Sequence, residues 1–402
     1  MVRVLTRMNI GGPAIHAAVL SNRLDPARFS TALVTGVAEA NEGDLSHLVD
    51  ASRVRVIRVA SLRRPLKPLA DLRTLARLTR ILWRERPHII HTHTAKAGCL
   101  GRVAGLLYNH VGPGRAAGQR AWLLHTFHGH VLEGYFSPRV SRFFITIERW
   151  LAHRCDGLIG VSPTVRDELL ALGIGAPQQW RVIELGLDLA SLSQIPLPAN
   201  GAPPVRVGLI GRLVPIKNPG LFLEALAQLN SRDANRSVQG VVVGDGPLRP
   251  SLEALARQLR LQETMTFLGW QQDLRRVYEQ VDIGCLTSWN EGTPVALIEA
   301  MAAGRPVVAT AVGGVRDLLE GDSRSRRLLG CGEVQVAPRG LLIRPGDVEA
   351  LARALQMLTS DPALRARLGQ AGRSYVMERF AANRLLDDMT AMYEDLEARR
   401  AA

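Results

Sequence analysis

Two carboxylates, Glu291 and Glu299, stand with seven residues between them in the segment 288–315. Carboxylates accept hydrogen bonds from sugar hydroxyls. We interpret residues 292–296 as the opening of a helix, where backbone amides attract anions such as a diphosphate. Phosphate-binding amides and hydroxyl-binding carboxylates on one short segment suggest a site for a sugar that is linked to a nucleoside diphosphate.

The helix between these carboxylates is predicted from its boundary residues. Thr293 is suited to the N-cap, Pro294 to the first helical position, and Gly304 to the position that ends the helix. We therefore expect Glu291 in the loop before the helix and Glu299 about two turns along it.

Two further turns carry groups that suit a phosphate. Arg212 and Lys217 flank the turn after the strand predicted at 205–210, and this turn leads into another helix. The two cations would bind a diphosphate and stabilise the charge that grows on a leaving group, although solvated loop charges are the alternative. Gly244 ends another strand in a Gly-Asp-Gly-Pro turn, which either lines a nucleotide pocket or is purely structural.

The first half of the chain contributes glycines and histidines. Gly11 and Gly12 follow the first predicted strand, where they either let the backbone approach a ligand closely or form only a tight turn. His128 also follows a strand, and we predict that it forms a hydrogen bond at the reacting sugar. No His-Glu-x-x-His and no Asp-x-Asp pair accompanies the histidines, so we expect no metal.

These residues follow strands in a repeating pattern of short apolar strands and helices, which predicts parallel sheets. The pattern runs through residues 1–190, is interrupted by a linker at 191–204, and restarts over 205–373. A last helix within 374–402 lies beyond the second unit and is expected to cross back to the first. We predict an α/β protein with two Rossmann-like, doubly wound parallel-sheet domains that face each other across a ligand cleft.

The positive charge of this 402-residue chain is concentrated in its first half. Of the net charge of +13, residues 1–195 carry +11, from 25 Lys and Arg against 14 Asp and Glu. Residues 53–86 combine basic residues with leucines at helical spacing. This pattern predicts either a helix that rests on an anionic membrane surface or an ordinary helix with a solvated basic face. No aromatic-rich pattern accompanies the charge, so nucleic acid is not an expected partner.

The location of the protein is predicted from what the sequence lacks. No apolar run reaches the roughly 20 residues of a membrane-spanning helix, and the amino terminus has no apolar signal segment. Four cysteines without paired spacing predict neither a zinc site nor a disulfide framework. We expect a cytoplasmic protein that associates peripherally with the inner face of the cytoplasmic membrane.

Several motifs occur in an order that resembles glycosyltransferase family 4. In the second half these are Gly-Arg-Leu-Val-Pro-Ile-Lys-Asn-Pro-Gly, Val-Gly-Asp-Gly-Pro-Leu-Arg, Phe-Leu-Gly-Trp and the block with Glu291 and Glu299. In the first half they are Asn-Ile-Gly-Gly-Pro-Ala-Ile-His, His-Thr-His-Thr-Ala-Lys-Ala-Gly and Thr-Phe-His-Gly-His. The resemblance implies the GT-B fold, a retaining transferase, and the branch that makes bacterial exopolysaccharides and lipid-linked glycans.

The resemblance also implies a role for each matching residue. Arg212 and Lys217 would bind the donor diphosphate, and Glu299 would hold the ribose hydroxyls. Glu291 would contact the donor sugar, and His128 would lie near the reacting carbon, so these two and the two cations form the expected catalytic group. The other expected donor contacts are Gly11, Gly12, Gly244, Leu268, Trp270, Gly292, Thr293, Pro294 and Val295.

Two segments depart from the family pattern. Residues 321–339 lengthen a connection that is usually short, and the resemblance assigns them no role. Glu184 and Leu185 stand where many relatives have Pro-Asn, so the resemblance does not define the contribution of this loop between the domains.

The implied reaction moves a hexose or N-acetylhexosamine from a nucleotide-diphosphate sugar, above all a UDP-sugar, to a glycan or polyprenyl-linked acceptor in cell-surface polysaccharide biosynthesis. It needs no cofactor and no metal. One alternative is a UDP-sugar 2-epimerase of the same fold, whose acid and base carboxylates are not evident in the first half. The other is a non-catalytic nucleotide-sugar-binding protein, which would lack the diphosphate cations or Glu299, all of which are present.

Overall fold

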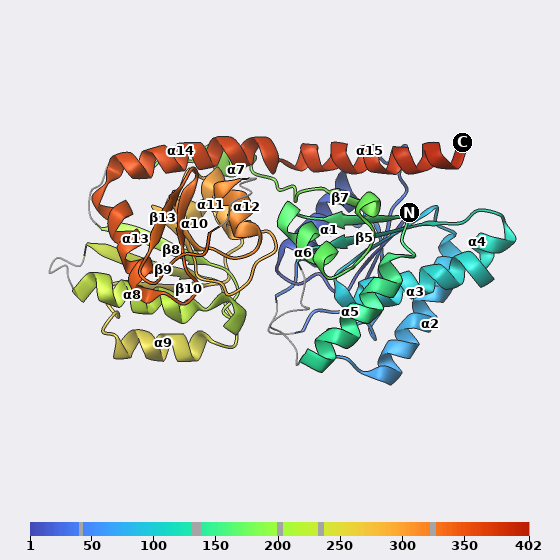
Figure 1. Cartoon of the computed structure of the whole chain (residues 1–402), viewed down its shortest axis with the longest axis horizontal. Coiled ribbons are helices and arrows are strands. Elements are labelled where there is room, and N and C mark those ends of the chain that lie inside the picture. The colour runs from blue at the N-terminus through green and yellow to red at the C-terminus, as the bar shows by residue number, and fades with distance from the viewer. Residues whose placement is uncertain (40–42, 130–137, 199–203, 232–236, 322–326, 402) are drawn as a thin grey trace. The chain divides into compact units, whose positions relative to one another are not determined.

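The protein folds into two compact units, each built around one seven-stranded sheet (Figure 1). One unit comprises Met1–Leu187 together with Ala382–Ala402, and the other comprises Asp188–Ala381. The predicted α/β class with two doubly wound, essentially parallel sheets is confirmed. The structure, a computed structural model, describes residues 1–39, 43–129, 138–198, 204–231, 237–321 and 327–401.

The first sheet has the strand order β3-β2-β1-β4-β5-β6-β7, and all neighbouring strands are parallel. Its order reverses between β1 and β4, and open α/β sheets bind ligands at the carboxyl ends of strands at such a switch point. The strands are β1 Val2–Leu5, β2 Ala32–Thr35, β3 Arg55–Arg58, β4 Ile89–His93, β5 Trp122–Phe127, β6 Gly157–Gly160 and β7 Trp180–Val182.

Helices cover both faces of the first sheet, as parallel sheets require. Successive strand residues point to opposite faces, so Ile90 and Leu123 pack with α2 and α3, whereas Ile89 and Leu124 pack with α1 and α15. The helices of this unit are α1 Gly12–Arg23, α2 Pro68–Glu85, α3 Ala95–Val111, α4 Pro113–Ala116, α5 Pro138–Ala152, α6 Pro163–Ala171 and α15 Ala382–Ala401.

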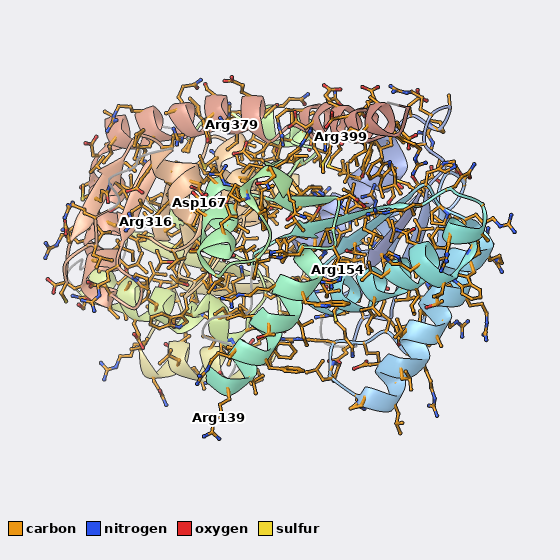
Figure 2. All side chains as sticks on the ribbon, turned by 45° about the vertical axis from the view of Figure 1, so that its right-hand side comes forward. Arg139, Arg154, Asp167, Arg316, Arg379 and Arg399 are labelled. Carbon is orange, nitrogen blue, oxygen red and sulfur yellow. The ribbon has the colours of Figure 1, made fainter. Side chains whose placement is uncertain are left out.

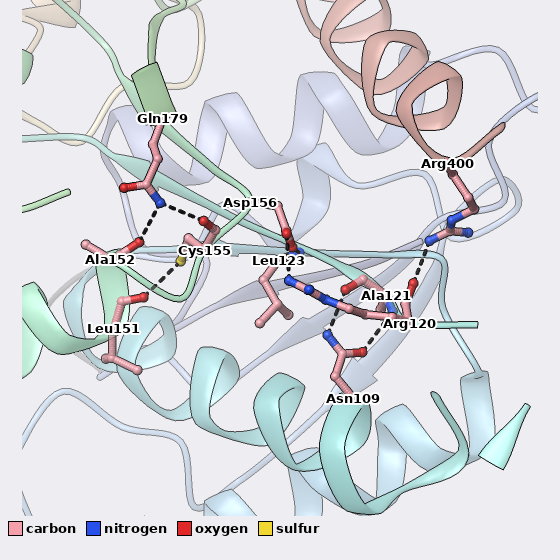
Figure 3. Close-up of polar contacts among 10 residues, drawn as sticks. All are labelled: Asn109, Arg120, Ala121, Leu123, Leu151, Ala152, Cys155, Asp156, Gln179 and Arg400. Carbon is pink, nitrogen blue, oxygen red and sulfur yellow. Dashed lines mark hydrogen bonds and ion pairs between the residues drawn. The ribbon is translucent and has the colours of Figure 1, made fainter. Parts of the chain in front are cut away.

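Polar contacts hold the amino end of β5 in place (Figure 3). Asp156 accepts a hydrogen bond from the Leu123 amide at 2.7 Å and one from Arg120 at 2.6 Å. Asn109 of α3 bonds to both the amide and the carbonyl of Ala121, each at 2.8 Å. Because this end is fixed, the register of the residues at the carboxyl end of β5 is fixed as well.

A buried ion pair joins α5 to α3. Arg102 is 1% exposed, and its Nη2 donates to the two carboxylate oxygens of Glu148 at 2.8 and 2.7 Å. Its Nε donates to the Gly98 carbonyl at 2.8 Å. The desolvation of both charges offsets much of their attraction, so we assign this pair a role in fixing the position of α5 rather than in adding stability.

The second sheet has the order β10-β9-β8-β11-β12-β14-β13 and is parallel except for its last pair. Its order reverses between β8 and β11, which creates a second switch point. The strands are β8 Val205–Ile210, β9 Val238–Val243, β10 Met265–Gly269, β11 Ile283–Leu286, β12 Val307–Thr310, β13 Val334–Ala337 and β14 Gly340–Ile343.

The long connection 321–339 supplies the antiparallel edge strand of this sheet. β13 pairs with β14 in the register Val334↔Ile343 to Ala337↔Gly340. The side chain of Gln335 also donates to Glu320 at the end of α12, at 2.7 Å. Residues 334–337 of this segment therefore extend the sheet, and residues 322–326 lie outside the described part.

The helices of the second unit also lie on both faces of their sheet. A large apolar cluster joins the strands to α8, α9 and α13, and Gly372 of α14 packs against Met301 of α11. The helices are α7 Ala190–Ser193, α8 Pro219–Ser231, α9 Arg249–Gln258, α10 Leu274–Glu279, α11 Val295–Ala302, α12 Gly314–Glu320, α13 Val348–Ser360 and α14 Pro362–Arg379. Among the described helices of the whole chain, none has the length and apolar character needed to cross a bilayer.

Part of the segment predicted as a linker is packed against the second unit. Ile195 is buried, and its carbonyl accepts a hydrogen bond from Arg373 at 2.5 Å. The Pro196 carbonyl accepts one from Arg305 at 3.1 Å. Pro- and Ser-rich composition therefore did not mean a free tether here, and residues 199–203 lie outside the described part.

The single helix predicted within 374–402 is in fact the end of α14 followed by α15. The break falls at residues 380–381. There the Ala382 amide donates to the Leu187 carbonyl at 3.0 Å rather than to a carbonyl of the preceding helix. α15 then belongs to the first unit, where Leu385 and Met389 pack in the cluster with α1.

Candidate functional site

The loops after β8 and β11 leave adjacent strands at the switch point of the second sheet. Hydrogen bonds join the two loops. The Trp289 amide donates to the Ile216 carbonyl at 2.8 Å, and Thr287 Oγ1 donates to the Lys217 carbonyl at 2.9 Å. The sequence motifs that contain Lys217 and Glu291, 74 residues apart, are therefore one structural site.

Lys217 and Glu291 form an ion pair between Nζ and Oε1. Ser288 Oγ donates to the same carboxylate oxygen at 2.6 Å. The Glu291 side chain is 8% exposed and that of Lys217 is 26% exposed, so solvent reaches the cation more than the carboxylate. The pair holds a partly exposed cation that a phosphate oxygen could also contact.

The backbone of Glu291 is held as firmly as its side chain. The Gly314 amide, at the start of α12, donates to the Glu291 carbonyl at 3.2 Å. Gly313 has φ +41, and a Cβ there would lie 2.1 Å from the same carbonyl oxygen. A glycine is therefore required at 313 for this close approach.

Glu299 is a buried carboxyl on α11. Tyr278 donates from its hydroxyl to Glu299 Oε2 at 3.2 Å and lies 3.0 Å from the Ala296 carbonyl. Burial raises the pKa of Glu299 to about 7, and the bond from Tyr278 lowers it only in part. Glu299 shares no hydrogen bond or ion pair with Lys217 or Glu291 within the described residues, so it is a separate group rather than one half of a carboxylate dyad.

The helix that carries Glu299 begins one residue later than we predicted. α11 starts at Val295, and its N-cap is Pro294 rather than Thr293, because the Pro294 carbonyl accepts the Ile298 amide at 3.2 Å. Glu299 is thus the fifth helical residue, a little more than one turn along rather than two.

The end of α11 is as predicted. Gly304 has φ +70, and its amide donates to the Met301 carbonyl at 2.8 Å. The Arg305 amide donates to the Ala300 carbonyl at 2.9 Å, which completes a Schellman motif.

Two glycines bring β8 and β9 together at the same edge. Gly244 has φ +124, and a Cβ on it would lie 2.0 Å from the Gly211 carbonyl oxygen. β8 and β9 pair up to Ile210↔Val243, so these glycines directly follow paired residues. A side chain at 244 would separate the two turns.

The remaining predicted donor contacts of this unit lie in or beside the same loops. Arg212 is half-buried directly after Gly211. Leu268 packs against the cluster of Val241, Val243 and Val277, whereas Trp270 is 37% exposed. Gly292, Thr293 and Val295 are half-buried, and Pro294 is buried.

In the first unit the predicted residues lie at the other switch point. Gly11 is the N-cap of α1, and Gly12 is the first residue of that helix, after β1. His93 ends the adjacent strand β4, and His128 follows β5. The predicted glycines and His128 are therefore grouped at the carboxyl edge of one sheet.

Three histidines meet there, of which only His128 was predicted to act. One ring nitrogen from each of His16, His93 and His128 lies within 4.8 Å of the others. His93 Nδ1 is 3.1 Å from His128 Nε2. Burial lowers the pKa of His128 to about 3 and holds those of His16 and His93 well below their ordinary value. At neutral pH these three rings are therefore neutral rather than cationic.

Sequence reasoning missed several of the groups that position the predicted residues. Arg3, a charged residue in an otherwise apolar strand, was a visible signal that we did not use. His16 and His93 stood inside the quoted motifs, and so did Ser288, without an assigned role. Tyr278 gave no signal, because its contact with Glu299 arises only from the packing of α10 against α11.

Two family models match successive parts of the chain. The model described as "Glycosyl transferase 4-like domain" matches residues 11–186, and "Glycosyl transferases group 1" matches residues 204–361. Together they include all of the predicted site residues, whereas Arg3 lies before the first matched residue.

Individual proteins resemble the chain over most of its length. The Escherichia coli UDP-Gal:alpha-D-GlcNAc-diphosphoundecaprenol alpha-1,3-galactosyltransferase is 26% identical over 88% of this chain and 87% of its own. The putative glycosyltransferase EpsD of Bacillus subtilis is 26% identical over 82% of each. The crystal structure of Anabaena HepE in complex with UDP and glucose superposes with a TM-score of 0.76 at 21% identity, over 98% of both chains. At that identity the superposition supports the fold.

Proposed function

Because the chain belongs to the glycosyltransferases with a group 1 domain and a 4-like domain, we propose that it transfers a hexose or N-acetylhexosamine from a UDP-sugar to a hydroxyl of a glycan or lipid-linked acceptor. The anomeric configuration of the donor is retained, and the product enters a cell-surface polysaccharide. The reaction adds the transferred sugar to the acceptor, and UDP is the leaving group.

The observation that carries this proposal is the Lys217–Glu291–Ser288 cluster, joined to the start of α11. The Lys217 cation and the backbone amides at the start of α11 are suited to bind a diphosphate. The Glu291 carboxylate, whose position the ion pair and Ser288 fix, is suited to accept a hydrogen bond from a sugar hydroxyl. The names of two similar proteins agree with this chemistry, since one uses UDP-Gal and the other was crystallised with UDP and glucose. The acceptor class is proposed from the diphosphoundecaprenol-linked substrate in the name of the first.

In the proposed mechanism the acceptor attacks the face from which UDP departs. The acceptor oxygen forms the new bond to the anomeric carbon as the bond to the β-phosphate oxygen breaks. The departing phosphate oxygen takes the acceptor proton, so no enzyme nucleophile is needed. Arg212, Lys217 and the amides of Gly292, Thr293 and Val295 stabilise the charge on the phosphate. Glu291 positions the sugar, and His128 contacts it near the reacting carbon.

Cationic side chains at the diphosphate would do what a metal does in other transferases. Glu299 would accept hydrogen bonds from the ribose hydroxyls of the nucleotide. Gly11, Gly12 and Gly244 would allow the backbone to approach the donor, with Leu268 and Trp270 beside the base.

A thermal-shift panel of UDP-, GDP- and ADP-sugars tests the donor class. We expect the melting temperature to rise with UDP-sugars and to change little with the others, since a ligand at about 100 times its Kd stabilises by about 2.7 kcal/mol. The rise should persist in EDTA. A preference for GDP- or ADP-sugars, or a rise that needs a divalent cation, would contradict the proposal.

Incubation of the enzyme with its UDP-sugar alone and with a polyprenyl-linked acceptor tests the reaction. Sugar transfer only in the presence of acceptor supports the transferase. Conversion of the UDP-sugar to its 2-epimer without acceptor would instead support an epimerase, and binding without turnover under both conditions would support a non-catalytic protein.

The membrane part of the proposal concerns α2 and α5. Figure 1 shows the first turns of both helices at the same lower edge of the first unit. Leu69 of α2 is 75% exposed, and Phe143 of α5 is 62% exposed. Arg139 points outward from the start of α5 (Figure 2). Exposed apolar side chains among arginines are the features that bind an anionic lipid surface.

We expect the double variant Leu69→Ser/Phe143→Ser to bind phosphatidylglycerol-containing vesicles at least about tenfold more weakly, because both side chains lose apolar contact with lipid. Vesicle co-sedimentation measures this. Leu328→Ser is the matched control, since Leu328 is 93% exposed on the second unit. Equal binding by the double variant and the control would refute membrane docking by these helices.

A further inference from the structure

Arg3 is a buried cation that has no carboxylate partner within the described residues. Its side chain is fully buried in β1. Nη1 lies 3.0 Å from His91 Nδ1 and 3.2 Å from His93 Nε2, and Nη2 lies 3.4 Å from the Tyr393 hydroxyl. Burying a guanidinium among neutral groups is costly. Such a residue is a poor choice for stability alone, which points to a role at the neighbouring site.

The contact of Arg3 with His93 has a defined direction. A guanidinium carries only donors and does not lose its proton in proteins. Nη1 therefore donates, and His93 Nε2 accepts with its lone pair. His93 is fully buried, and burial together with the nearby Arg3 holds its pKa well below the ordinary value. The ring is thus neutral, and its single proton is on Nδ1.

The same reasoning extends one residue further. His93 Nδ1 lies 3.1 Å from His128 Nε2, so His93 donates and His128 accepts. His128 is also neutral at physiological pH, because burial lowers its pKa to about 3. Its single proton is then on Nδ1. His93 is the one hydrogen-bond partner of the His128 ring within the described residues, so Nδ1–H remains available to a ligand.

We propose that Arg3 is a positioning residue that acts through His93 to fix the tautomer of His128, so that His128 offers an N–H donor at Nδ1 to an oxygen of the bound substrate. This inference rests on the proposed function, in which His128 contacts the donor sugar. Without Arg3 the His93–His128 bond could form in the opposite direction, and His128 would then present a lone pair to the same oxygen.

The three-histidine cluster could also suggest a metal site. Both ring nitrogens of His16 are buried without a hydrogen-bond partner, and the three rings are close enough to share an ion. A metal ligand needs a lone pair, however, and the proton that Arg3 places on His93 Nδ1 removes it. The Arg3 contact therefore favours the hydrogen-bonded chain over a metal.

Ring-nitrogen NMR of the full chain, labelled with 15N-histidine and treated with EDTA, tests the chain of tautomers directly. We expect His93 and His128 each to carry the proton on Nδ1, and we expect Arg3→Met to give a mixture of tautomers at His128. Tyr393→Phe is the matched control, because it removes bonds to Arg3 and His91 from the same network but leaves the Arg3–His93 contact. Its spectrum at His128 should be unchanged.

Three results would overturn the proposal: a wild-type His128 with its proton on Nε2, an Arg3→Met spectrum identical to wild type, or stoichiometric Zn²⁺ binding that shifts the nitrogens of all three rings. Arg3→Lys keeps a donating cation and should restore part of the wild-type spectrum. If Arg3→Met does not fold, His93→Phe interrupts the same chain and should also give mixed tautomers at His128.

A double-mutant cycle separates this inference from the proposed function. With the UDP-sugar that the thermal-shift panel selects, Arg3→Met should lower kcat for UDP release about tenfold, as for the loss of one hydrogen bond, with little change in KM. In a His128→Ala background it should cause no further loss. If His128→Ala itself leaves kcat unchanged, the proposed contact of His128 fails, and the NMR spectra still decide whether Arg3 fixes the tautomer.

Discussion

Replacing Lys217 with alanine is expected to lower kcat for sugar transfer by about a hundredfold to a thousandfold, the usual effect of removing one group that stabilises developing negative charge. The Lys217 ammonium is partly exposed and pairs with Glu291, which lies in the loop before α11. In the proposed mechanism this cation faces the β-phosphate, whose charge increases as the bond to the sugar breaks. Its loss should therefore raise the energy of the transition state more than that of the bound donor.

The measurement is steady-state transfer together with UDP affinity. We expect kcat to fall by a larger factor than the affinity for UDP, because the charge on UDP is partly present before reaction. Arg353→Ala is a control for losing a positive charge in the same unit, since Arg353 pairs with Glu349 on the exposed side of α13. A Lys217→Ala enzyme that folds and keeps kcat within threefold of wild type would contradict the assignment.

Because Lys217 is paired with Glu291, a double variant can test whether the fall in kcat comes from the lost cation or from the carboxylate left without its partner. Removing the lysine also leaves a mostly buried carboxylate with Ser288 as its partner. Lys217→Ala/Glu291→Gln relieves that unpaired charge and should recover thermal stability but not kcat. Recovery of both would mean that the unpaired Glu291 carboxylate, rather than the loss of a phosphate-binding cation, causes the fall in kcat, and that transfer does not need this carboxylate.

The sequence was most informative where a single local rule decides the structure. Gly304 has the left-handed φ that ends α11, as its position predicted. The alternation of strands and helices predicted two parallel sheets, because a crossover between two strands brings the chain back to the edge where the first strand began; the antiparallel pair of β13 and β14 is the exception. These features depend on residues close together in the chain.

Features that depend on long-range packing could not be predicted in the same way. The bond of Tyr278 to Glu299 joins two helices, and no pattern around either residue indicates it. The N-cap of α11 lies at Pro294 because the backbone path, rather than the polarity of Thr293, decides where helical bonds begin. Residues 191–204 were predicted as a linker from composition. Only the hydrogen bonds from Arg305, which follows α11, and from Arg373 of α14 reveal that residues 195 and 196 are packed.

Glu299→Gln is expected to make the free protein more stable at pH 8 while it weakens the binding of UDP. Burial raises the pKa of Glu299 from 4.5 to about 7. A carboxyl whose pKa is raised in the folded state stabilises the protein below its unfolded pKa and loses that contribution as pH rises through the folded pKa. Stability should therefore fall between about pH 4.5 and pH 7 in the wild type, by an amount on the order of 3 kcal/mol for a shift of this size.

Urea unfolding of both proteins at pH 5 and pH 8 measures this difference. Glutamine resembles the protonated carboxyl, so the two proteins should have similar free energies of unfolding at pH 5 and differ at pH 8, with the variant more stable by about 2–3 kcal/mol. Glu279→Gln, which alters an exposed carboxyl on α10, is the control. A wild-type minus Glu299→Gln difference that is the same at both pH values would show that this carboxyl is not the titrating group.

UDP binding should change the protonation of the same carboxyl, Glu299. Ribose hydroxyls that donate to Glu299 stabilise its charged form, so UDP should lower its pKa and release a proton when it binds near pH 6.5. Calorimetric titration in two buffers of different ionisation enthalpy measures that release, which should disappear in Glu299→Gln along with part of the affinity. A carboxyl that destabilises the free protein at neutral pH but becomes satisfied when UDP binds would explain why the chain buries an acid at this position. If UDP binds equally well to the variant, with the same proton release, the ribose contact belongs to another residue.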